Sequence, residues 1–323
     1  MQPYSSACIV PDDNTASSGS VQFRCVGQMD GHEDDVLECS FSNNRRMLAT
    51  ASRDTTLRLW DVDSHQCIAT LEDHTNHVNS CKFSPDDTLV ASASSDETVR
   101  LWDAKSHRCV ARLNGHTAAV ESCAFSTNGA VFASASDDMT IRLWDMNSFR
   151  NVVTLYGHTA YVNGCDISRH GILASTSGDN TVRLWDMNTQ QCITVLHGHK
   201  DWYGYNEWFN KCCFTADGTL LASTSQRGTV RLWDMRIRQN IATLADPTDA
   251  ALQCSFSNDG SLLAAACCAD DGVARVWDVK TFRCIATLQE SYVYACSFSP
   301  NGMIATGGGD DRNRRPSAIY LWQ

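Results

Sequence analysis

The chain has 323 residues, and 43% of them are hydrophobic, which is enough for a substantial core. Asp and Glu outnumber Lys and Arg by 37 to 26, giving a formal net charge of −11. This balance opposes a broad surface for nucleic acid, because phosphate binding depends mainly on Lys and Arg. No segment approaches the roughly 18 consecutive apolar residues of a membrane-spanning helix. We therefore expect no direct contact with nucleic acid and no membrane insertion.

The N-terminal segment, residues 1–20, is rich in Ser, Asp, Asn and Pro. It has neither the basic start nor the long apolar run of a signal peptide, and such a composition cannot bury enough apolar surface to fold. We predict a disordered tail over residues 1–20 and a single domain over residues 21–323. The chain is expected in the cytoplasm or nucleus and not among secreted proteins.

Short runs in which apolar and polar residues alternate begin after this tail, and this period of two predicts β-strands. The first unit contains four of them: Val36–Phe41, Met47–Ser52, Thr56–Trp60 and Cys67–Leu71. In later units the turn between the first two runs carries pairs that favour the positive φ of tight hairpins. These pairs are Asn128-Gly129, Asp217-Gly218, Asp259-Gly260 and Asn301-Gly302.

The unit repeats along the whole domain, and tryptophan marks its period. Tryptophans recur at intervals of 41 to 48 residues, and all but the last are followed by Asp: Trp60, Trp102, Trp144, Trp185, Trp233, Trp277 and Trp322. A Gly-His pair precedes several of them: Gly31-His32, Gly115-His116, Gly157-His158 and Gly198-His199, with Asp73-His74 as a variant. One four-stranded sheet cannot cover both of its faces, but sheets stacked radially around an axis can.

The two ends of the domain complement each other. The last unit ends at Trp322-Gln323, after its third strand. The missing fourth strand is found at the start, where Phe23–Val26 precedes a Gly-His pair as Gln66–Ala69 precedes Asp73-His74. We predict that the N-terminal strand completes the C-terminal unit, which removes an exposed sheet edge and makes seven units in all.

The Gly-His and Trp-Asp pairs at this period resemble those of the WD-repeat family over residues 21–323. The resemblance implies an all-β, seven-bladed WD-repeat β-propeller, closed by pairing of the N-terminal strand with the C-terminal blade. It also implies a non-catalytic scaffold or adaptor that binds partner peptides or proteins on one face, called the top, and needs no cofactor. We expect the propeller itself to be monomeric and to act as a subunit of a larger complex.

Each of the first four blades contains a His, a Ser, an Asp and a Trp that the family joins in a chain of hydrogen bonds from Trp through Ser and His to Asp. Four copies of one arrangement favour a structural role over a catalytic triad, since buried polar groups need partners. The sets are His32, Ser52, Asp54 and Trp60; His74, Ser94, Asp96 and Trp102; His116, Ser136, Asp138 and Trp144; and His158, Ser177, Asp179 and Trp185.

The chain has 16 cysteines, and most of them follow the repeat. Seven share one position: Cys39, Cys81, Cys123, Cys165, Cys212, Cys254 and Cys296. Five share another: Cys25, Cys67, Cys109, Cys192 and Cys284. Because a free thiol behaves as a small hydrophobic group, we predict free core thiols and neither disulfides nor a metal site.

The family resemblance places the residues three and five after the Gly-His histidine on the top face, together with the residue before the turn Asp. Applied to this chain, that rule gives Tyr161 in blade four and both Trp202 and Gly204 in blade five; counting back from Cys296 gives Tyr292 and Tyr294 in blade seven. The turn positions are Arg53, Ser95, Asp137, Gly178 and Gln226.

Two insertions fall on the same face. Blade five has six extra residues within 201–210, a stretch that contains Trp202, Tyr203, Tyr205 and Trp208. Trp and Tyr are favoured binding hot spots, although the insertion can instead fold onto its own blade. Blade seven has five extra residues within 307–316, where Arg312, Arg314 and Arg315 offer either a clamp for a carboxylate or phosphate or a solvated loop.

A scaffold or adaptor is the favoured function. A narrower alternative is a substrate receptor of a cullin-type ubiquitin ligase, because Trp233-Asp234-Met235-Arg236 matches the signature of such receptors and makes Arg236 a candidate ligase-adaptor contact. An enzyme is less favoured, since the sequence shows no metal-ligand spacing and no phosphate-binding glycine loop. A coat or trafficking subunit fits the fold without specific support.

Overall fold

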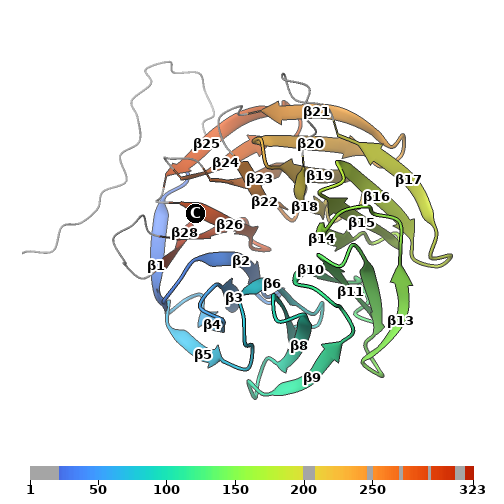
Figure 1. The fold of residues 1–323 in the computed structure, drawn as a ribbon. Helices are drawn as coiled ribbons and strands as arrows, with labels where there is room; N and C mark the ends of the chain where they lie inside the picture. Colours follow the sequence, from blue (N-terminus) through green and yellow to red (C-terminus); the bar gives the residue numbers. More distant parts are fainter. Residues whose placement is uncertain (1–21, 199–207, 246–249, 269–271, 290–291, 310–316) are drawn as a thin grey trace, which may run out of the picture.

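A computed structural model describes residues 22–198, 208–245, 250–268, 272–289, 292–309 and 317–323. The described residues form strands and turns but no helix. Seven antiparallel sheets of four strands each, blades one to seven, are arranged in a ring (Figure 1). The sequence prediction of a seven-bladed all-β propeller is therefore confirmed.

In blades one to four the strands run outward from the axis in chain order. Blade one contains β2 (Val36–Phe41), β3 (Met47–Ser52), β4 (Leu57–Asp61) and β5 (Cys67–Leu71). Blade two contains β6 (Val78–Phe83), β7 (Leu89–Ser94), β8 (Thr98–Asp103) and β9 (Cys109–Asn114). Blade three contains β10 (Val120–Phe125), β11 (Val131–Ser136), β12 (Ile141–Asp145) and β13 (Arg150–Leu155). Blade four contains β14 (Val162–Ile167), β15 (Ile172–Ser177), β16 (Thr181–Asp186) and β17 (Cys192–His197).

The remaining blades follow the same plan until the ring closes. Blade five contains β18 (Phe209–Phe214), β19 (Leu220–Ser225), β20 (Thr229–Asp234) and β21 (Gln239–Ala245). Blade six contains β22 (Ala250–Phe256), β23 (Leu262–Cys268), β24 (Val273–Asp278) and β25 (Arg283–Gln289). Blade seven contains β26 (Val293–Phe298), β27 (Ile304–Gly308) and β28 (Ser317–Trp322), with β1 (Cys25–His32) as its outermost strand.

The ring closes as the sequence predicts. Strand β1 pairs antiparallel with β28, from Cys25 opposite Trp322 to His32 opposite Ser317. Beyond the strand, Arg24 and Gln323 exchange backbone hydrogen bonds of 2.8 and 3.0 Å. The strand is longer than predicted, because it continues past Val26 to the histidine of the first Gly-His pair. The last blade thus joins both ends of the chain and leaves no unpaired edge on β28.

The tight turns between the first two strands of the blades require positive φ. Glycine supplies it at the predicted Gly129, Gly218, Gly260 and Gly302, where φ lies between 69° and 88°. In blade two Asp87 takes this conformation, with φ of 59°. The Asn-Gly and Asp-Gly pairs were therefore interpreted correctly, since residues without a Cβ adopt this region at little cost.

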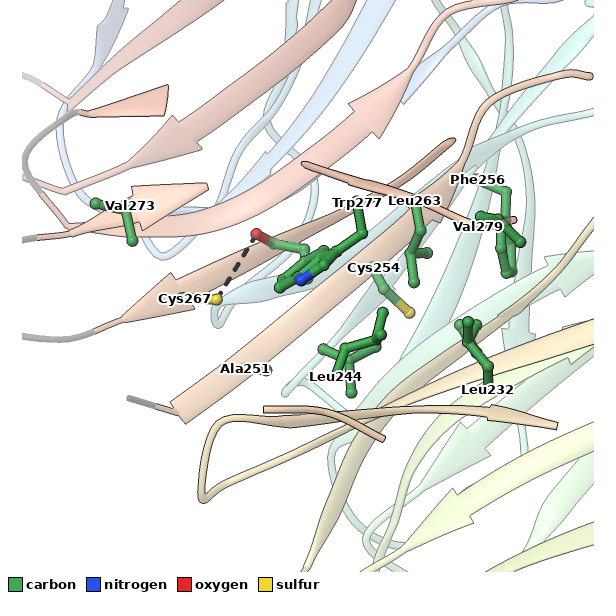
Figure 2. Close-up of a cluster of buried hydrophobic side chains, with 13 residues drawn as sticks. Leu232, Leu244, Ala251, Cys254, Phe256, Leu263, Cys267, Val273, Trp277 and Val279 are labelled. Carbon is green, nitrogen blue, oxygen red and sulfur yellow. Dashed lines mark hydrogen bonds between the residues drawn. The ribbon is translucent and has the colours of Figure 1, made fainter. Parts of the chain in front are cut away.

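The core lies between the blades, not within them. Figure 2 shows one such cluster, in which Leu232 and Leu244 of blade five meet Phe256, Leu263 and Trp277 of blade six. Each of these side chains is less than 10% exposed. A blade therefore buries its apolar face only against its neighbour, which ties the stability of every blade to closure of the ring.

Candidate partner-binding face

The polar set of blade three illustrates how the repeat satisfies its buried polar groups. The indole Nε1 of Trp144 donates to Ser134 Oγ at 2.9 Å, and Ser134 Oγ lies 2.8 Å from His116 Nε2. His116 Nδ1 lies 2.7 Å from Asp138 Oδ2. Blades one, two and four repeat the arrangement with Thr50, Ser92 and Ser175 as the central hydroxyl.

The serine that the sequence analysis assigned to each of these hydrogen-bond networks was wrong. Ser52, Ser94, Ser136 and Ser177 do not link Trp to His; each stands two residues later, at the end of its strand. Trp144 is paired with Phe132, so its indole reaches the next residue on the same face of the strand, which is Ser134. The hydroxyl of Ser136 instead donates to Ala118 O and accepts from the backbone N–H of Asp138. The histidines, aspartates and tryptophans of blades one to four make the hydrogen bonds described above.

These sets are structural, because every functional atom is occupied and buried. Asp138 accepts hydrogen bonds from His116, from the backbone N–H of Thr117 and from both the N–H and the hydroxyl of Thr140. Burial would raise the pKa of the Asp138 carboxyl, but the bonds from His116 and Thr140 hold it well below its usual range. The side chain of His116 is only 1% exposed, which leaves no room for a substrate.

Blades five to seven depart from this pattern, as the sequence indicates. The indole of Trp233 donates to Ser223 Oγ at 2.9 Å, and that of Trp322 donates to Thr306 Oγ1 at 2.8 Å. Blade six has Ala265 opposite Arg275, where other blades have the central hydroxyl. In blade five Arg227 takes the place of the aspartate, while His199 lies outside the described residues.

Backbone hydrogen bonds define one end of the ring, which we call the top face. In blade four, Gly178 in the turn between the second and third strands donates to Tyr161 O at 3.1 Å. The equivalent bond joins Gln226 to Trp208 in blade five and Gly309 to Tyr292 in blade seven. Trp208 is therefore the blade-five counterpart of Tyr161.

The assignment of this position to Trp202 was wrong by six residues. The insertion precedes β18, so counting forward from His199 stops before the strand begins. By the same register the second position of the rule is occupied by Asn210 and not by Gly204. Trp202, Tyr203 and Tyr205 lie outside the described residues, as do Arg312, Arg314 and Arg315.

The structure brings two of the predicted aromatic residues into contact. The ring centroids of Tyr161 and Trp208 lie 6.1 Å apart with their planes at 87°, an edge-to-face geometry that aromatic pairs favour. Gly178 makes room for this contact, since a Cβ there would lie 2.6 Å from the Tyr161 ring. Trp208 remains 48% exposed. This pair forms an aromatic edge across blades four and five.

An exposed carboxylate stands beside this edge. Asp137 occupies the turn position of blade three, and its negative charge, added to the larger effect of burial, raises the pKa of Tyr161. Although Asp137 is exposed to solvent, partial desolvation by its neighbours and then the charge of Asp138 raise its pKa. Its carboxylate makes no ion pair with any residue that the structure describes. The sequence rule placed Asp137 on this face but gave no reason to select it.

The other predicted aromatic residues lie on the opposite arc of the top face. Arg53 of blade one stands over the ring of Tyr294 at 5.6 Å from its centroid, and its Nη1 bonds Asp35 Oδ2 at 2.6 Å. Tyr292 has φ of 47° and accepts the backbone bond from Gly309. Tyr294 is thus held against a paired arginine, whereas Trp208 has exposed ring surface.

A family model described as WD domain, G-beta repeat matches the chain seven times, at residues 23–61, 65–103, 107–145, 149–186, 190–234, 238–278 and 282–313. The chain belongs to the WD-repeat family. WD-repeat propellers generally mediate protein interactions. Among curated proteins, none matches this chain.

The axis of this WD-repeat propeller contains a buried charge network that spacing in the sequence does not reveal. Lys82 Nζ lies 2.6 Å from Glu38 Oε1, and Lys211 Nζ lies 3.8 Å from Glu38 Oε2. Burial would raise the pKa of Glu38, but the two ammonium groups lower it. The network joins blades one, two and five across the axis.

Arg236 lies at the end of the propeller opposite the top face, in the turn between β20 and β21. Its Nη2 bonds Asp234 Oδ2 at 2.7 Å, and its side chain is 80% exposed.

In the part of the chain that the structure describes, no group of three or more His, Cys, Asp or Glu is placed to hold a metal ion. The same residues include no helix long and apolar enough to cross a membrane.

Proposed function

We propose that this WD-repeat propeller is a non-catalytic scaffold or adaptor that binds a partner peptide or protein across its top face. The observation that carries the proposal is the edge formed by Tyr161 and Trp208, where a large indole is half exposed. Covering such a ring gains apolar burial at a small cost in side-chain entropy, which is why Trp and Tyr dominate binding hot spots.

The charge beside this edge favours a cationic partner side chain. The Asp137 carboxylate stands beside Tyr161, and desolvation already disfavours its charged form. A Lys or Arg from the partner would neutralise this carboxylate while lying against the aromatic rings, a combination of ion pairing and cation–π attraction. We extend the proposal to Trp202, Tyr203 and Tyr205, which precede Trp208 in the chain, and to Arg312, Arg314 and Arg315. We also propose a cytoplasmic or nuclear location within a larger complex.

The test replaces Trp208 by Ala and measures the affinity for a partner first captured from cell lysate with the wild-type chain. We expect the dissociation constant to rise by about 30-fold or more, since truncating a hot-spot tryptophan costs about 2 kcal/mol. Calorimetry on the purified pair gives the value.

A matched control separates this site from a general effect of lost aromatic surface. Phe282 is 40% exposed and lies in the turn between β24 and β25, at the end opposite the top face. Phe282→Ala should leave the affinity unchanged. If a folded Trp208→Ala protein binds as tightly as wild type, the aromatic edge is not the binding site.

The exposed side chain of Arg236 supports a second proposal, that of a substrate receptor for a cullin-type ubiquitin ligase. The arginine is held by Asp234 yet presents its guanidinium to solvent. We expect the ligase adaptor to be captured with the wild-type chain and lost with Arg236→Ala, while binding at the top face is retained. Equal capture by both proteins would contradict this role.

A further inference from the structure

Two thiols meet where blades five and six adjoin the axis. Cys213 Sγ of β18 and Cys254 Sγ of β22 lie 3.3 Å apart. Cysteines at the repeat position face other groups elsewhere: Cys81 Sγ contacts carbonyl oxygens of Glu38 and Ala49, and Cys296 Sγ contacts Gln253 O. The contact therefore depends on a departure from the repeat.

That departure is the second cysteine of the Cys212-Cys213 pair. Cys212 holds the repeat position and is buried, whereas Cys213, one residue later on the strand, is partly exposed; both residues line the axial cavity. Lys82 and Asp166 hold the same position in blades two and four. The Cys213 thiol can therefore be reached from the cavity. It lies against Cys254, the repeat cysteine of the next blade.

The two sulfurs differ in access. Cys213 is partly exposed, and Cys254 is 6% exposed. The neighbouring Cys213 thiol and burial raise the pKa of Cys254, which is therefore protonated at neutral pH. Both residues line the axial cavity, so we expect an oxidant there to react first with the more exposed Cys213, with Cys254 in place to react next.

We propose that Cys213 and Cys254 form an oxidisable dithiol that hydrogen peroxide converts into a disulfide between blades five and six. The Cys213 sulfur attacks peroxide, the O–O bond breaks, and the products are a sulfenic acid on Cys213 and one water molecule. The Cys254 sulfur then attacks Cys213 Sγ; the S–S bond forms, the S–O bond breaks, and the hydroxyl leaves with the Cys254 proton as a second water. Two thiols are oxidised while one peroxide is reduced.

The disulfide would join two blades that lack part of the buried His–Ser–Asp–Trp hydrogen-bond network. It links innermost strands of the two blades in which Arg227 and Ala265 replace members of the polar set, and it closes a loop of 41 residues. A disulfide needs its sulfurs at about 2.05 Å, so rotation about the side-chain bonds and a small approach of the strands complete the geometry. Constraining the unfolded chain in this way stabilises the folded ring.

The experiment treats the full chain with hydrogen peroxide under native conditions, alkylates the remaining thiols and maps unreduced peptides by mass spectrometry. We expect a peptide pair linked through Cys213 and Cys254 as the main disulfide, and a higher thermal unfolding midpoint that a reducing agent reverses. The inference is overturned if Cys213 and Cys254 stay alkylatable while other cysteines oxidise, or if other pairs dominate.

Variants provide the control for specificity. Cys213→Ser and Cys254→Ala should each abolish both the linked peptide and the peroxide-dependent rise in midpoint. Cys284→Ser removes an exposed cysteine on the outer strand of blade six and should change neither. A rise in midpoint that persists in folded Cys213→Ser protein would assign the effect to another residue and overturn the proposal.

Discussion

Replacing Asp138 by Ala should lower the free energy of unfolding by about 3–5 kcal/mol, because it breaks a buried hydrogen-bond network. The carboxylate receives four hydrogen bonds, from His116 Nδ1, the N–H of Thr117 and two groups of Thr140. Alanine would leave the donors of His116 and Thr140, which are buried, without an acceptor. For a chain of this size the thermal midpoint should fall by roughly 5–8 °C, measured by calorimetry or circular dichroism.

The preceding residue is the natural control. Asp137 is exposed and forms no ion pair with the residues that the structure describes. Asp137→Ala should therefore change stability by less than about 0.5 kcal/mol, while weakening the binding of a cationic partner. Equal loss of stability in the two variants would contradict the division between a structural aspartate and a surface one.

The blades were predictable from sequence because their information is local. Alternation over Val36–Phe41 and Met47–Ser52 gave both strands with the bounds that the structure has. The count of strands gave ring closure, since the missing partner of β28 had to come from residues before Val36. These inferences depend on period and number alone, which do not require knowledge of side-chain contacts.

The side-chain contacts between strands were harder to predict from the sequence. Ser134 and Ser136 lie on the same face of β11, and only the pairing of Trp144 with Phe132 decides which hydroxyl the indole reaches. An insertion likewise hides the register in blade five, because residues added before a strand displace every count made from the preceding histidine. Trp208 could have been found by counting backward from the repeat cysteine Cys212.

Contacts across the ring could not be predicted from one repeat. Glu38 and Lys211 belong to blades one and five, and Cys213 meets Cys254 through a position that the repeat does not reserve for cysteine. The proximity of Glu38 and Lys211 follows from closure of the whole ring around its axis, whereas Cys213 and Cys254 meet between neighbouring blades. The same closure sets up the test with the largest expected effect on the fold.

Deleting residues 1–31 should abolish cooperative folding or leave an aggregating chain, whereas deleting only residues 1–20 should leave the thermal midpoint unchanged. The longer deletion removes nearly all of β1, exposes the edge of β28 and uncovers the apolar cluster that Met29 fills. An exposed strand edge invites pairing with other chains, and each blade of the ring depends on its neighbours. Gel filtration and calorimetry on both proteins measure the difference.

Two further measurements test whether the effect of the longer deletion comes from the loss of ring closure by β1. Met29→Ala retains the strand but removes a side chain that is 1% exposed, and it should cost about 2–5 kcal/mol through lost burial and the cavity left behind. A synthetic peptide spanning residues 22–32, added to the longer deletion, should restore a cooperative transition by pairing with β28 in trans. If the longer deletion unfolds at the same midpoint as the shorter one, β1 does not close the ring, and blade seven is stable with three strands.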